Sequence, residues 1–104
     1  MICWSITAYT ATEPDDVLID ANATTTYTDA HRAAGDAALA ALDHLAGEQP
    51  HAIPFLTISI DDEPLLLACA SKDEHGTVDH ASLKAAAAHV RETGQAYAPT
   101  ATPW

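Results

Sequence analysis

The chain has 104 residues, which suits one domain with a single hydrophobic core. Its 15 acidic residues outweigh 4 Lys and Arg, and the net charge of −11 disfavours direct binding to nucleic-acid phosphate or to an anionic membrane surface. Because 23 residues are Ala, the apolar fraction of 48% predicts a thin core, which gains stability from a partner, a second copy or high salt.

The first part of the chain indicates strands. Residues 2–10 alternate apolar and polar side chains, the period of a half-buried strand. Val17 to Ile19 predict a short second strand, and the β-branched residues 24–28 favour a further one. Cys3 and Cys69 both fall on predicted strands, and we expect them to be reduced, buried, small apolar side chains.

A helix is predicted over residues 29–46, capped by Thr28 or Asp29 and ended by Gly47. Its apolar stripe repeats every three or four residues and consists of His31, Gly35, Ala38, Leu42 and Leu45. His31 on this stripe is best explained as a boundary histidine, with a tunable catalytic base as the alternative. The opposite side carries an acidic ridge at heptad spacing, formed by Asp29, Asp36 and Asp43, and Arg32 has the helical spacing to pair with it.

Two apolar runs, residues 53–60 and 65–70, flank the sequence Asp61-Asp62-Glu63-Pro64 and predict a hairpin. Since three consecutive leucines begin the second run at Leu65, we expect its strand to be covered on both faces and central in the sheet.

A second helix is predicted over residues 80–93, with Asp79 as N-cap and Gly94 after its end. Residues 95–104 contain two prolines and form a tail or at most an edge strand. We therefore predict a single acidic α+β domain over residues 1–104. Its two layers are a mostly antiparallel sheet of about four strands and two helices on one face, for which a ferredoxin-like arrangement is one option.

The loop before the second helix gathers five potential metal ligands around Gly76, namely Asp73, Glu74, His75, Asp79 and His80. A solvated loop leading into a capped helix is the favoured interpretation of the same residues. The histidines and cysteines show no zinc-site spacing, and the chain has neither a phosphate-binding loop nor a nucleophile elbow. We expect neither a cofactor nor catalysis.

The size, the acidity and the segment Pro54-Phe55-Leu56-Thr57-Ile58-Ser59-Ile60-Asp61-Asp62-Glu63-Pro64-Leu65-Leu66-Leu67 resemble the central hairpin of small acidic immunity proteins, which neutralise bacterial polymorphic toxins. The resemblance covers about a third of the chain. It implies a cognate toxin as partner and transfers no binding residue.

These observations favour a non-catalytic, cytoplasmic inhibitor or immunity-type protein that covers a basic site on a protein partner. The expected contact residues are the acidic ridge, the turn carboxylates and a terminal aromatic anchor, that is, Asp29, Asp36, Asp43, Asp61, Asp62, Glu63 and Trp104. One alternative is a self-assembling structural or accessory subunit from a phage, plasmid or halophile. Another is a small metal-dependent enzyme using His75 and His80.

Overall fold

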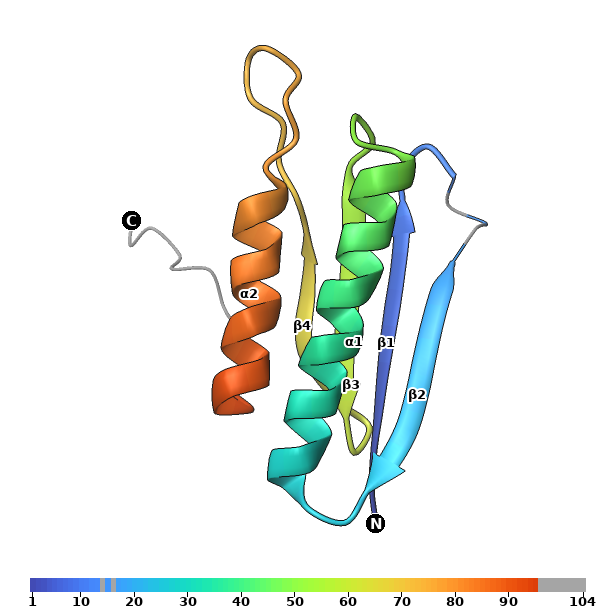
Figure 1. Cartoon of the computed structure of the whole chain (residues 1–104), viewed down its shortest axis with the longest axis vertical. Coiled ribbons are helices and arrows are strands. Elements are labelled where there is room, and N and C mark those ends of the chain that lie inside the picture. The colour runs from blue at the N-terminus through green and yellow to red at the C-terminus, as the bar shows by residue number, and fades with distance from the viewer. Residues whose placement is uncertain (14, 16, 96–104) are drawn as a thin grey trace.

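The computed structural model of the chain describes residues 1–13, 15 and 17–95. These residues form four strands and two helices (Figure 1). In chain order they are β1 (Ile2–Thr10), β2 (Leu18–Thr24), α1 (Tyr27–Glu48), β3 (Pro54–Ile60), β4 (Glu63–Cys69) and α2 (His80–Thr93). The predicted tail beyond Gln95, including Trp104, lies outside the described residues.

The strands make one antiparallel sheet in the order β2-β1-β3-β4. Both helices lie on the same face of this sheet and run antiparallel to each other (Figure 1). The predicted two-layer α+β fold is thus confirmed. The element order is ββα repeated twice, with β1 and β3 as the central strands, so it differs from the βαββαβ order of the ferredoxin-like arrangement.

The core lies between the helices and the central strands. Alternate residues of these strands point towards the helices and are buried, namely Trp4, Ile6 and Ala8 of β1 and Leu56, Ile58 and Ile60 of β3. Both helices bury alanines among a few large residues, such as Leu42 and Val90. Small side chains allow the helices to approach closely, but each one buries little apolar area.

The region between β1 and α1 differs from the prediction. One strand, β2, covers residues 18–24, and the helix begins at Tyr27 rather than at residue 29. The helix also continues to Glu48, past the predicted stop at Gly47, and its C-cap is Gln49. Thr26 is the N-cap, because its hydroxyl accepts a hydrogen bond from the backbone N–H of Asp29 at 3.1 Å. Residues 24–28 therefore form no strand of their own. In contrast, α2 begins and ends where the sequence predicts, with Asp79 and Gly94 as its caps.

The prediction that β4 is central was wrong, because β4 is an edge strand and Leu67 is 81% exposed. Leu65 and Leu66 are nevertheless both buried. The pairing with β3 shifts between Ile58 and Ser59, so that Leu65 is the extra residue of a β-bulge. The bulge turns two consecutive leucines towards the core and imitates the pattern of a strand covered on both faces.

Candidate interaction surfaces

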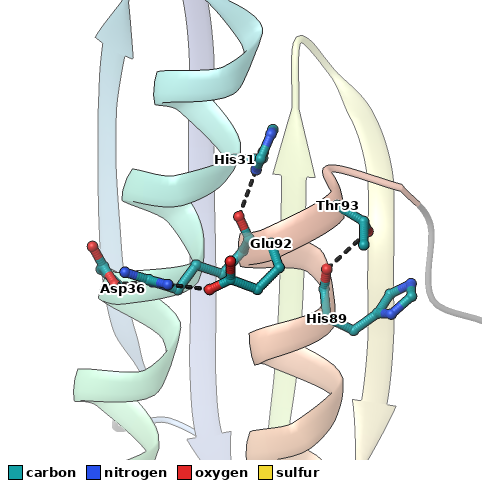
Figure 2. Close-up of polar contacts among 6 residues, drawn as sticks. His31, Asp36, His89, Glu92 and Thr93 are labelled. Atoms are coloured by element: carbon teal, nitrogen blue, oxygen red, sulfur yellow. Dashed lines mark hydrogen bonds and ion pairs between the residues drawn. The ribbon is translucent and has the colours of Figure 1, made fainter.

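Two charges of the predicted acidic ridge are occupied by contacts within the molecule. The Arg91 Nε of α2 donates to the Asp36 Oδ1 of α1 at 2.5 Å (Figure 2). Lys84 of α2 forms an ion pair with Asp43. The hydrogen bond and the charge of Asp36 raise the pKa of the Arg91 guanidinium. The sequence predicted that Arg32 of the same helix pairs with this ridge. The partners are instead Arg91 and Lys84, which both belong to α2. Asp36 and Asp43 thus connect the two helices.

Asp29, the third member of the ridge, lies apart from this helix–helix contact. It is exposed in the first turn of α1, at the end of the molecule where the β3–β4 turn also lies (Figure 1). Burial and the charge of Glu63 raise the pKa of the Tyr27 hydroxyl, so Glu63 acts on the first residue of α1. The structure therefore groups Asp29 with the turn carboxylates Asp61, Asp62 and Glu63 in what we call the acidic end.

The β3–β4 turn has an unusual composition for its geometry. β3 ends at Ile60 and β4 begins at Glu63, which leaves a two-residue turn with φ angles of 53° at Asp61 and 66° at Asp62. Two consecutive positive φ angles are typical of a type I′ turn, for which Asn-Gly, Asp-Gly and Gly-Gly are the preferred sequences. Asp61 fits the first position, whereas Asp62 places a second carboxylate at the position that Gly prefers.

The predicted metal ligands have structural roles in the loop and at the helix start. The Asp73 Oδ1 accepts hydrogen bonds from the backbone N–H groups of His75 at 2.8 Å and Thr77 at 2.9 Å. Asp79 accepts from the backbone N–H of Ser82 at 3.1 Å, and its hydrogen bonds to Ser82 lower its pKa. Across the described part of the chain, no three His, Cys, Asp or Glu side chains are grouped to hold a metal ion.

His31 lies in the contact between the helices. It is buried, its ring is tilted against that of Tyr27, and its Nδ1 donates to the Arg91 carbonyl at a distance of 2.6 Å (Figure 2). A Cβ at Gly94 would overlap the His31 ring, so the αL cap of α2 also leaves room for this side chain. The contacts give His31 a packing role at the C-terminal end of α2.

The face of the sheet opposite the helices is uncovered in the described part of the chain, and it is the surface that sequence reasoning missed. Its positions alternate with the core positions of the four strands. They are Cys3, Ser5, Thr7 and Tyr9 of β1, Ile19, Ala21 and Ala23 of β2, Phe55, Thr57 and Ser59 of β3, and Pro64, Leu67 and Cys69 of β4. None of these residues is charged, and the polar side chains among the strand positions of this face carry hydroxyl or thiol groups.

The two cysteines belong to this open sheet face, and the expectation that they are buried was wrong. Both thiols are free and exposed. The alternation of residues 2–10 already placed Cys3 opposite to the core positions, so the signal was present in the sequence. Because β3 lies between β1 and β4, Cys3 and Cys69 are not on neighbouring strands.

Comparison with known proteins adds no assignment, since no family model, curated protein or solved structure matches the chain. Neither of the helices in the described residues has the length and apolar run required to cross a bilayer.

Proposed function

We propose that this chain is a non-catalytic interaction protein of the inhibitor or immunity type, which acts in the cytoplasm and covers a basic site of a protein partner with its acidic end. The observation that carries the proposal is the two-residue turn at Asp61 and Asp62, where Asp62 keeps a second carboxylate at the positive-φ position that Gly prefers. Retaining a residue in a strained conformation suggests a functional use of its side chain.

The charges of the acidic end support the same function. Asp29, Asp61, Asp62 and Glu63 are exposed and lie at one end of the molecule, whereas Asp36 and Asp43 are engaged by basic residues of α2. Concentrated charge at an exposed surface accelerates encounter with an oppositely charged partner and orients it. We therefore reduce the predicted contact surface to the acidic end and exclude Asp36 and Asp43 from it.

The test is a variant that removes the charge of the turn and relieves its backbone strain, with Asp61→Asn, Asp62→Gly and Glu63→Gln. We expect the free energy of unfolding to rise by about 1 kcal/mol, because Asn-Gly suits a type I′ turn. Affinity for a basic protein captured from cells of the source organism should fall by about tenfold or more, which is about 1.4 kcal/mol. Denaturation by urea measures the first quantity, and titration calorimetry measures the second.

A matched control removes three carboxylates from the opposite end, with Glu13→Gln, Glu48→Gln and Glu74→Gln (Figure 1). Its affinity for the same captured protein should stay close to that of the unmodified chain. Equal loss of affinity in both variants would mean that only net charge matters, and unchanged affinity in the turn variant would remove the acidic end from the contact.

A further inference from the structure

We propose that the open sheet face is the interface between two copies of this chain, packed face to face about a two-fold axis parallel to the strands. This proposal rests on the uncharged rows of the open sheet face and not on the acidic end, of which Asp62 borders this face in a hollow that Cys3, Ser5 and Ser59 also line.

The first argument is the distribution of charge. Each copy carries a net charge of −11, so two copies repel each other wherever carboxylates face carboxylates. The open sheet face contains no charged residue in the described strands, and it presents Ile19 and Leu67 with 71% and 81% of their surface exposed. Asp62 borders the face beside the β3–β4 turn, but the central rows offer no carboxylate to a basic partner. An equally uncharged surface of a second copy therefore suits these rows.

The second argument is the order of side chains across the sheet. The pairing of the strands aligns the row Ile19, Thr7, Thr57 and Leu67, and beside it the row Ala21, Ser5, Ser59 and Pro64. Each row reads apolar, hydroxyl, hydroxyl, apolar from either edge. On the other side of the Ile19–Leu67 row, Tyr9 and Phe55 are neighbours, and their stacked rings have centroids 5.1 Å apart.

Rows that read alike in both directions suit a particular symmetry. A two-fold axis midway between β1 and β3, parallel to the strands, exchanges the two edges of the sheet while it keeps each row at its height. Ile19 of one copy then faces Leu67 of the second copy, and Tyr9 faces Phe55 of the second copy. The two threonines of the central row face each other in the same way. The contact is isologous and closes at two copies. Because this axis keeps each row at its height, it brings the acidic ends of both copies to the same end of the dimer, and salt screens the repulsion between them.

The third argument is the size of the face. Four strands spaced about 4.8 Å apart and about seven residues long, with a rise of about 3.3 Å per residue, give a face of roughly 19 by 23 Å. The flat area is on the order of 440 Å², to which the uneven surface of the side chains adds. A standard interface buries about 800 Å² on each partner, and smaller interfaces belong to reversible complexes. We therefore expect a dimer that dissociates on dilution.

Sedimentation of the full chain over a concentration series, in about 0.1 M and about 1 M NaCl, measures this association. The mass should rise from one chain to two, and it should do so at lower protein concentration in high salt, because salt screens the repulsion between the acidic copies. Binding of a basic partner to the acidic end weakens in high salt, so the two proposals fail or succeed separately.

Charge reversal across the interface tests the register. Ile19→Lys and Leu67→Glu should each weaken the dimer by about tenfold or more. Each substitution is present in both copies, so the interface would bury two unpaired charges. The double variant should recover association, since every new Lys faces a new Glu of the other copy. Within one copy the two positions are three strands apart, roughly 14 Å, and cannot form this pair.

Ala40, exposed on α1, provides the matched controls Ala40→Lys and Ala40→Glu, which change the net charge equally and should leave the dimer within a fewfold of the unmodified chain. Because Ile19 and Leu67 are exposed in the single chain, their substitution leaves its fold intact, which circular dichroism verifies. A mass of one chain at every concentration would overturn the proposal. Loss of the dimer in both single variants without recovery in the double variant would overturn the two-fold arrangement.

Discussion

Gly35 and Gly47 lie in the same helix, but only Gly35 has a close neighbour. A Cβ at Gly35 would overlap the Cβ of Arg91 and lie 2.7 Å from its Cα, whereas a Cβ at Gly47 would meet no atom within 4 Å. The absence of a side chain at Gly35 therefore allows α1 and α2 to approach, and the ion pair between Asp36 and Arg91 forms beside this contact.

The two glycines predict opposite effects of one substitution. Gly35→Ala should lower the free energy of unfolding by about 1–3 kcal/mol, since the backbone of Arg91 must move. Gly47→Ala should raise it by about 0.5–1 kcal/mol, because Ala favours a helix where space is open. Urea denaturation of both variants checks the pair, and stabilisation by Gly35→Ala would contradict the close approach of the helices.

At the scale of elements, both ends of α2 and the bounds of β1 were predictable, whereas both ends of α1 and the edge position of β4 were not. Asp79 and Gly94 identify the ends of α2, because a cap acts on residues within one turn. The edge position of β4 could not be read from Leu65 to Leu67, since a bulge in the pairing with β3 produces the same run of apolar residues. Likewise, Thr26 displaces the start of α1 through a single side-chain hydrogen bond.

The cap of α2 also predicts a dependence on pH. Hydrogen bonds from Ser82 lower the pKa of Asp79 below its ordinary value of 3.8, so its ionised form stabilises the folded chain above that value. This contribution is lost as the pH falls through the lowered pKa. Asp79→Asn keeps a capping acceptor that does not titrate.

The stability difference between the unmodified chain and Asp79→Asn should therefore shrink as the pH falls from about 5 to about 2. Urea denaturation at several pH values measures it. A difference that stays constant over this range would show that ionised Asp79 makes no special contribution to the cap.

For the whole molecule, charge repulsion opposes folding. The chain has fifteen acidic residues and a core rich in Ala, and the ion pairs of Asp36 and Asp43 neutralise only a part of the acidic charge. Salt shortens the range of charge interactions from about 10 Å at 0.1 M to about 3 Å at 1 M. Because like charges dominate, screening should favour the compact state.

We accordingly expect the free energy of unfolding to rise between 0.1 M and 1 M NaCl in samples dilute enough to contain single chains. Thermal or urea denaturation measures the change, and potassium chloride serves as the control because screening does not depend on the identity of the monovalent cation. Stabilisation by one cation alone would indicate a specific ion site and contradict screening as the cause.

The sequence by itself determined the class of fold, the two helices, the hairpin at Asp61 and Asp62 and the excess of acid, because periodicity, caps and composition are local properties. Only the tertiary structure decided which strands lie at the edges, which basic residues neutralise Asp36 and Asp43, and that Cys3 and Cys69 share an uncharged open face. These features depend on contacts between segments distant in sequence. A strand pattern distinguishes two faces of a sheet, but it does not identify which face the helices cover or the order of the strands.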